Sequence, residues 1–131
     1  MKASELRLGN LIHLNGIDYD QEGNKFHDPL GDVVIEVTMI DTMQVSYGER
    51  KEADTEDCSG ISLTEQWLTK FGWGTDSEPE EYGIYQQSDG SYSLIDDYGD
   101  GATYYVGSMK YVHQLQNLYF ALTGEELEIK P

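Results

Sequence analysis

Apolar and polar positions in the first third of the chain follow the period of short β-strands. Residues 11–14 form an apolar run, and residues 33–40 form a longer run dense in β-branched side chains, which favour strands. Apolar and polar side chains alternate over residues 43–47. Asn15–Gly16, a pair typical of tight hairpins, and Asp41–Thr42 supply turns between these runs. The pattern predicts a small curled antiparallel sheet or barrel.

The pattern changes to a helical period after residue 62. Ser62 and Glu65 have the spacing of a capping box, in which the two side chains satisfy free backbone donors at a helix N-terminus. Apolar residues follow at helical spacing as far as Phe71, and Gly72 is placed to end the helix. Further short apolar runs, with turn residues between them, predict a second antiparallel sheet. These runs are residues 84–85, 92–95 and 103–106, with turns at Asp89–Gly90 and at residues 99–101.

A second helix is expected over residues 108–123, with Ser108 as its N-cap. A tyrosine and three leucines recur every three or four residues from Tyr111 to Leu122, which predicts an apolar stripe. His113 lies off this stripe. Its side of the helix is predicted to be either a solvated polar face or a recognition surface.

These elements predict an α+β fold. It contains a small antiparallel β-barrel-like sheet at the N-terminus, a short second antiparallel sheet and two amphipathic helices. The length of 131 residues and the 38% of apolar residues are sufficient for one hydrophobic core. We therefore predict a single domain over residues 1–131, mainly β over residues 1–60, with the helices and remaining strands over residues 61–131.

Charge narrows the choice of partners. The chain has 25 acidic and 8 basic residues, a formal net charge of −17, which disfavours direct contact with nucleic-acid backbones or anionic membranes. The acidic residues are concentrated in the middle, where residues 49–100 hold 14 acidic residues and 3 basic ones. Within this region residues 49–60 are predicted as a charged loop. No lysine or arginine occurs between Lys70 and Lys110.

Tyrosines alternate with carboxylates in this stretch, which we call the acidic tyrosine band. Carboxylates supply charge and tyrosines supply rigid contact area with a hydroxyl group, so the band suits a basic protein surface such as a nucleic-acid-binding cleft. Spaced carboxylates can also imitate the phosphates of a duplex. The alternative is that the charge only keeps the protein soluble. The predicted partner-binding residues are Asp76, Glu78, Glu80, Glu81, Tyr82, Tyr85, Asp89, Tyr92, Asp96, Asp97, Tyr98 and Asp100.

One motif has the character of a metal site. Asp18, Asp20 and Glu22 occupy positions 1, 3 and 5 of a calcium loop, and a glycine follows at position 6. The bidentate glutamate of position 12 is missing, because that position is Pro29. The motif is therefore a weak metal candidate, and the alternative is a polar loop over residues 18–32. We predict no bound metal and no cofactor.

Other chemistry finds no support in the sequence. There is no HExxH, P-loop, GxGxxG or GxSxG motif, so we predict that the protein is not an enzyme. Cys58 is the single cysteine, and carboxylates around it disfavour the thiolate, so an unreactive loop thiol is expected. There is no run of about 18 apolar residues and no apolar segment near Met1, so we expect a cytoplasmic protein.

Three stretches carry a resemblance to a known group. They are residues 1–10 (MKASELRLGN), residues 62–72 (SLTEQWLTKFG) and residues 111–127 (YVHQLQNLYFALTGEEL). In order and placement they resemble small uncharacterised proteins encoded by bacterial phages and mobile elements. That group brings no established activity or catalytic residue, and the resemblance implies a cytoplasmic accessory protein that acts on the host. The sequence departs from the group over residues 18–32 and in its acidic middle.

Two functions remain. The leading hypothesis is a non-enzymatic accessory protein that binds and inhibits a basic host protein, a defence or nucleic-acid-handling component, through a surface that mimics DNA. The alternative is a protein that binds or sequesters a small ligand such as a nucleotide signal, in a pocket between protomers of a homo-oligomer. That alternative needs local positive charge, for which Arg7, Arg50 and Lys51 are candidates.

Overall fold

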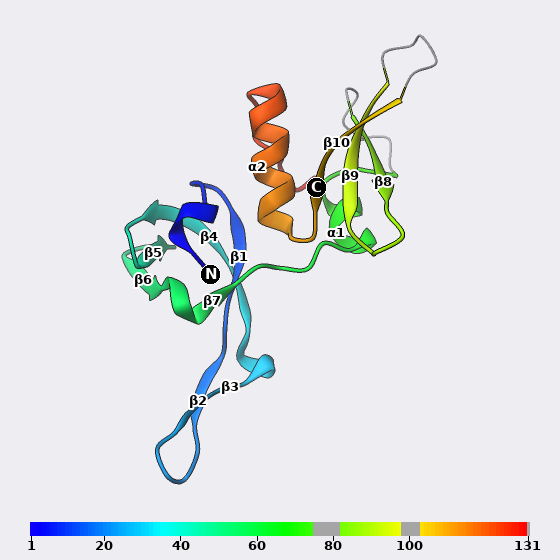
Figure 1. Cartoon of the computed structure of the whole chain (residues 1–131). Helices are drawn as coiled ribbons and strands as arrows, with labels where there is room; N and C mark the ends of the chain where they lie inside the picture. The colour runs from blue at the N-terminus through cyan, green and yellow to red at the C-terminus, as the bar shows by residue number, and fades with distance from the viewer. Residues whose placement is uncertain (75–81, 98–102, 131) are drawn as a thin grey trace. The chain divides into compact units, whose positions relative to one another are not determined.

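The computed structural model describes residues 1–74, 82–97 and 103–130. The chain forms two compact units, Met1–Ile61 and Ser62–Pro131, which we call the N-terminal and C-terminal units (Figure 1). Antiparallel sheets and helices together confirm the predicted α+β class. The two predicted β regions belong to separate sheets. The prediction of a single domain over the whole chain stays a prediction.

A curled five-stranded antiparallel sheet with the shape of a half-barrel forms the N-terminal unit (Figure 1). Its strand order is β6-β5-β4-β1-β7, so β6 and β7 lie at the two edges. The sheet matches the predicted barrel-like architecture, and two of the predicted strands have the expected bounds. The strands are β1 (Leu11–Leu14), β4 (Val33–Ile40), β5 (Gln44–Tyr47), β6 (Lys51–Asp54) and β7 (Cys58–Ser59).

The core of this unit lies on one face of the sheet. Successive strand residues point to opposite faces, so Ile35 and Val37 of β4 are buried and Glu36 between them is exposed. Ile12 of β1 lies opposite Ile35 of β4, and both are buried. A short 3₁₀-helix, η1 (Ala3–Glu5), precedes β1. The buried cluster consists of Leu6, Ile12, Ile35, Val37, Val45 and Cys58.

Three predictions for the N-terminal unit are wrong. Asn15–Gly16 does not form a hairpin turn after β1, because β1 pairs with β4 and β7. The two segments predicted as loops, residues 18–32 and 49–60, contain regular structure. The prediction missed it because short polar strands show no clear alternation of apolar and polar residues in the sequence. These segments hold β2 (Ile17–Tyr19), β3 (Lys25–His27), the 3₁₀-helices η2 (Pro29–Gly31) and η3 (Thr55–Asp57), and the strands β6 and β7.

Strands β2 and β3 pair with each other and form a two-stranded arm (Figure 1). Two glycines meet at its base, where a Cβ atom on Gly16 would lie 2.3 Å from the carbonyl oxygen of Asp28 and 2.5 Å from Cα of Gly31. The Gly16 carbonyl accepts the Asp28 N–H at 2.7 Å, and the Gly16 N–H donates to Oδ1 of Asp32 at 2.8 Å. The two segments that meet at the base of the arm therefore approach too closely for any side chain at position 16.

The carboxylate of Asp32 is expected to titrate at an unusually low pH. Its Oδ1 accepts the N–H of Gly16 and lies 2.6 Å from Nε2 of His27. The backbone hydrogen bond, followed by the bond to His27, holds the pKa of Asp32 below its ordinary value. A depressed pKa in the folded state means that the ionised carboxylate stabilises the fold above a pH of about 3.9. This stabilisation is lost as the pH falls through the lower, folded pKa.

We expect the amide proton of Gly16, followed by NMR, to titrate with a midpoint below about 3.9, the value of an unperturbed aspartate. An Asp32→Asn variant should abolish this titration, because the group that loses its charge is gone. A midpoint at or above the ordinary value in the native protein, or the same titration in the variant, would contradict the assignment.

A three-stranded antiparallel sheet and two α-helices form the C-terminal unit (Figure 1). The strand order is β10-β9-β8, which confirms the three predicted strands. Gly90 has a left-handed φ of 88°, as the predicted Asp89–Gly90 turn requires. The predicted turn at residues 99–101 lies outside the described residues. The elements are α1 (Glu65–Lys70), β8 (Gly83–Gln86), β9 (Tyr92–Asp97), β10 (Thr103–Met109) and α2 (Val112–Thr123).

Both helices begin later than the sequence predicts. The N-cap of α1 is Thr64, whose side chain accepts the N–H of Trp67 at 3.4 Å, while Ser62 forms a β-bridge with Tyr111. Ser108 belongs to strand β10, and Tyr111 takes the N-cap position of α2. In both cases a hydroxyl residue with good cap chemistry is used instead to extend the chain, so cap propensity alone misplaces the boundary.

The predicted apolar stripe of α2 is only partly right. Leu115 is buried, but Tyr111 and Leu122 are exposed. His113 is only 2% exposed and its ring stacks on that of Tyr111, so the prediction of a solvated or recognition face at His113 is wrong. The prediction that both helices are amphipathic stays a prediction. Within the described ranges, no helix combines the length and apolar character needed to cross a membrane.

Candidate functional site

Half of the residues predicted to bind a partner lie outside the described residues. They are Asp76, Glu78, Glu80, Glu81, Tyr98 and Asp100. Asp96 and Asp97 belong to β9, where their backbones lie opposite Tyr104 and Thr103 of β10. The structure therefore places only part of the band, on the strands and turn of the β8–β9 hairpin.

The located residues of the band differ in how they are used. Tyr85 of β8 is 47% exposed, and Tyr82 is half-buried. Tyr92 is only 5% exposed and belongs to the core of the C-terminal unit, which corrects its predicted role as a contact residue. The alternation of a β-strand does not account for this burial, because residues 91–94 are consecutive and all four are buried.

Asp89 is exposed and held in the turn between β8 and β9. Its Oδ1 accepts hydrogen bonds from the Ser91 hydroxyl at 2.6 Å and from the Ser91 N–H at 2.9 Å. These bonds, the hydroxyl first, lower the pKa of Asp89, so its negative charge is fixed at neutral pH. Asp89 thus serves the turn and also presents a permanent charge.

The calcium-like motif has a structural role in the arm. Oδ1 of Asp20 accepts the N–H groups of Glu22 at 2.9 Å and Asn24 at 2.8 Å, and Oδ1 of Asp18 accepts the N–H of Tyr19. These bonds, that of Asn24 first, lower the pKa of Asp20. One oxygen each of Asp18 and Asp20 therefore serves the backbone of a polar hairpin loop.

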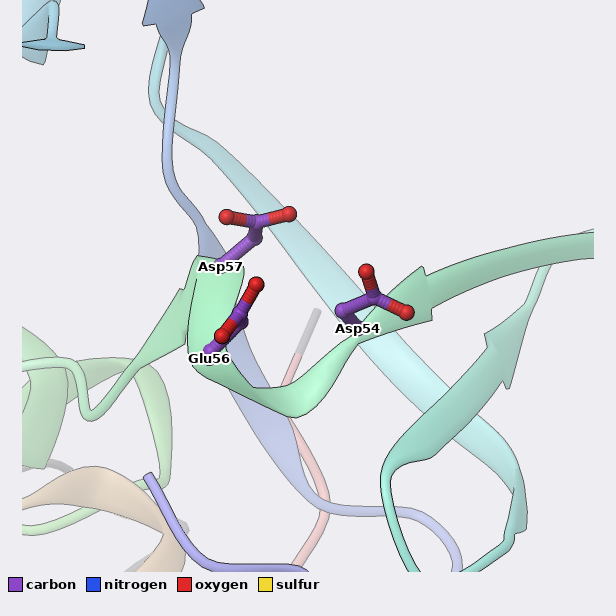
Figure 2. Close-up of side chains that lie close together, drawn as sticks. All are labelled: Asp54, Glu56 and Asp57. Carbon is purple, nitrogen blue, oxygen red and sulfur yellow. The ribbon is translucent and has the colours of Figure 1, made fainter. Parts of the chain in front are cut away.

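A cluster of three carboxylates that the sequence did not indicate lies between β6 and β7. Within the part of the chain that the structure describes, Asp54, Glu56 and Asp57 bring one oxygen each within 4.8 Å of the others (Figure 2). Oδ1 of Asp57 pairs with Nζ of Lys25 at 2.6 Å, and Oδ1 of Asp54 accepts Nε2–H of Gln44 at 3.0 Å. Two members therefore already hold partners from the same unit: the Asp57 bond joins the arm to η3, and the Asp54 bond joins β5 to β6.

Two hollows lie beside this cluster on the N-terminal unit. The larger has a volume of about 410 Å³ and the smaller about 130 Å³. Asp41 and Gln44 line both, so the hollows adjoin along the turn before β5 and the surface of β5 and β6. The lining residues of the larger are Asp41, Thr42, Met43, Gln44, Asp54, Thr55 and Glu56, and those of the smaller are Met39, Ile40, Asp41, Gln44, Ser46 and Glu52.

The hollows are acidic. Asp41, Glu52, Asp54 and Glu56 supply four carboxylates, and neither hollow has a lysine or arginine among its lining residues. Hydrogen bonds from the N–H and hydroxyl of Thr42 lower the pKa of Asp41, which keeps it ionised. The density of acidic residues between 49 and 57 was the signal for this surface in the sequence. Because that segment was predicted as a loop, the pairing of β5 with β6 that brings these carboxylates together was not expected.

The basic residues considered for a nucleotide site do not line these hollows. Arg50 lies in the turn between β5 and β6 with a left-handed φ of 59°, and the Lys51 ammonium group lies 6.0 Å from the centre of the Tyr47 ring. Arg7 precedes β1, and its N–H donates to Oδ1 of Asn10 at 2.7 Å.

Comparison of this chain with protein families, with characterised proteins and with solved structures gives no significant match. The resemblance to phage and mobile-element proteins therefore stays a prediction.

Proposed function

We propose that this chain is a non-enzymatic acidic accessory protein of a phage or mobile element, which binds and inhibits a basic host protein in the cytoplasm. One observation carries the proposal: eight carboxylates and six tyrosines, without a lysine or arginine, lie between Lys70 and Lys110. A host protein that handles nucleic acid, such as a defence component, has a cationic cleft. Closely spaced carboxylates compete there for the groups that bind phosphate.

The located part of the acidic tyrosine band supports this proposal. Tyr85 offers exposed aromatic area on the β8–β9 hairpin, and Asp89 offers a charge that its bonds to Ser91 keep ionised. Tyrosine is enriched at the centres of protein interfaces, where its ring contributes area and its hydroxyl a hydrogen bond. A surface that combines exposed tyrosine area with fixed negative charge is suited to contact with a basic protein.

The alternative, a nucleotide-binding protein, is less well supported by the described residues. Phosphate groups need cationic or N–H-rich surroundings. The larger hollow instead presents Asp41, Asp54 and Glu56, which repel an anion. A nucleotide is therefore disfavoured in this hollow. A homo-oligomeric state is compatible with the proposal but is not required by it.

A capture experiment tests this function. The immobilised protein is incubated at about 50 mM salt with a bacterial lysate cleared of nucleic acid, and retained proteins are identified by mass spectrometry. We expect basic proteins that duplex DNA displaces, with retention falling at least tenfold at about 0.5 M salt because both charged surfaces are screened. Absence of any retained basic protein at the lower salt concentration would contradict the proposal.

A pair of matched variants separates the band from net charge alone. The band variant carries Asp76→Asn, Glu78→Gln, Glu80→Gln and Glu81→Gln, and it should lose most of the captured protein. The control variant carries Glu36→Gln, Glu49→Gln, Glu125→Gln and Glu128→Gln, four exposed positions outside the band, and it should retain the protein. Equal losses in the two variants would show that only total charge matters.

A further inference from the structure

Strand β6 is an edge of the five-stranded sheet, with β5 on one side only. In an antiparallel pair, alternate residues bond to the neighbouring strand, and the residues between them direct their N–H and C=O groups away from it. The N–H of Thr55 donates to the carbonyl of Met43 at 2.8 Å, in the register in which β6 pairs with β5. By this alternation Glu52 and Asp54 turn their backbone groups outward, away from β5.

The outward groups at Glu52 are open to a partner. Among the hydrogen bonds of the described residues, none involves the N–H or C=O of Glu52, whereas the carbonyl of Asp54 accepts the Sγ–H of Cys58 at 3.5 Å. Both side chains are exposed on the strand. A strand edge with free donors and acceptors is a template on which an extended chain can pair.

The side chains around this edge specify the charge of such a chain. Glu52 and Asp54 stand two residues apart, so they lie on the same face of β6 and border the smaller and the larger hollow respectively. Asp41 and Glu56 add two more carboxylates to the same surface. We call this surface, made of strand β6 and these four carboxylates, the acidic edge.

We propose that the acidic edge binds a basic, extended segment of another protein, which adds as a strand beside β6. Lysine or arginine residues at alternate positions of that segment would lie opposite Glu52 and Asp54. The hollows have room for their long side chains. The choice of a basic partner rests on the proposed function, but the surface belongs to the other unit of the chain and can be tested separately.

The alternative occupant, a second copy of this chain, is disfavoured by the same charges. Pairing of two β6 edges would bring Glu52 and Asp54 against the identical carboxylates of the other copy, and like charges on opposed strand positions are destabilising. Charged residues on an edge strand commonly prevent self-association in this way. An edge that rejects its own copy and retains free backbone groups is selective for a segment of opposite charge.

The test uses a short fluorescent peptide that alternates lysine and valine, with binding followed by fluorescence anisotropy at about 20 mM salt. We expect the full-length protein to bind this peptide and not its glutamate–valine counterpart. A lysine–valine peptide N-methylated at alternate residues keeps every charge but loses backbone donors along one edge, and it should bind at least tenfold more weakly. Equal binding of the methylated peptide would overturn strand addition in favour of charge attraction alone.

Protein variants locate the binding. Glu52→Gln with Asp54→Asn should raise the dissociation constant at least about fivefold, since two ion pairs are lost, while Glu36→Gln with Glu49→Gln should leave it unchanged. Glu52→Pro should also abolish binding without unfolding the sheet, because the lost N–H points away from β5. Its far-ultraviolet circular dichroism shows whether the fold is kept.

The outcomes also separate this inference from the proposed function. Unchanged peptide binding in the Glu52→Gln, Asp54→Asn variant overturns the acidic edge, as does a concentration-dependent dimer of the native protein that Glu52→Pro dissociates. Capture of basic proteins that depends on the acidic tyrosine band would stand in either case. If the band variant loses capture of host protein and still binds the peptide normally, the two surfaces act independently.

Discussion

Replacement of Ile12 by alanine should lower the free energy of unfolding of the chain by about 2–5 kcal/mol, because it removes buried methyl groups and leaves a cavity. Ile12 has 0% exposure and lies in β1, which pairs with β4 on one side and β7 on the other. A strand with neighbours on both sides cannot move to fill the space without disturbing two hydrogen-bonded ladders. A loss of this size is a large share of the stability of a typical domain, about 5–15 kcal/mol.

Urea denaturation followed by circular dichroism measures this effect. Leu8→Ala is the matched control, because the side chain of Leu8 is exposed and its removal should change the free energy of unfolding by less than about 0.5 kcal/mol. Ile12→Val should lie between the two, at about 0.5–1.5 kcal/mol. A cost for Ile12→Ala no larger than that for Leu8→Ala would show that the half-barrel has no tightly packed core at β1.

Substitution of Gly16 by alanine is the second change expected to have a large effect, about 1–3 kcal/mol, because it forces overlapping atoms apart. The new Cβ atom would stand 2.3 Å from the Asp28 carbonyl oxygen and 2.5 Å from Cα of Gly31, and backbone atoms cannot rotate away as a side chain can. The Asp28 N–H bonds to the carbonyl of Gly16, so its hydrogen exchange should accelerate sharply.

Two further variants test the physical reason. Gly23 has a left-handed φ of +85° and open space around it, so Gly23→Ala should cost only about 1–2 kcal/mol through backbone conformation, without affecting exchange at Asp28. Gly31 approaches Gly16 from the other side of the same contact. The losses in the free energy of unfolding from Gly31→Ala and Gly16→Ala should therefore be less than additive in the double variant, since either substitution already separates the two segments. Full additivity would contradict a shared contact.

Strong local patterns predicted much of this fold. The β-branched run of β4 and the short apolar run of β1 were both located with the observed bounds, and three strands in an antiparallel sheet were expected in the C-terminal unit. These strands bury part of their side chains, and burial selects apolar residues at regular positions, which can be recognised in the sequence. The prediction failed where strands are polar and short, as in β2, β3 and β6, because their mostly exposed residues impose no apolar periodicity on the sequence, although each pairs with the strand next to it along the chain.

The failure at Asn15–Gly16 has a specific cause. Asn-Gly favours a hairpin turn through positive φ angles, but Gly16 is used here for its lack of a side chain, in contact with Gly31. The sequence gives no means of distinguishing these two uses of glycine. In the same way, the acidic edge joins Asp41 to residues of β6, a proximity that only the pairing of β5 with β6 creates.

The buried position of Cys58 makes its thiol a natural reporter of local unfolding. Cys58 is the single cysteine of the chain, its thiol donates to the carbonyl of Asp54, and burial, ahead of the charge of Asp57, raises its pKa. An alkylating reagent reaches this sulfur only while the segment that runs from β6 through η3 to β7 is locally open. The rate of thiol modification therefore reports how often the N-terminal half-barrel opens locally, without a label introduced anywhere in the chain.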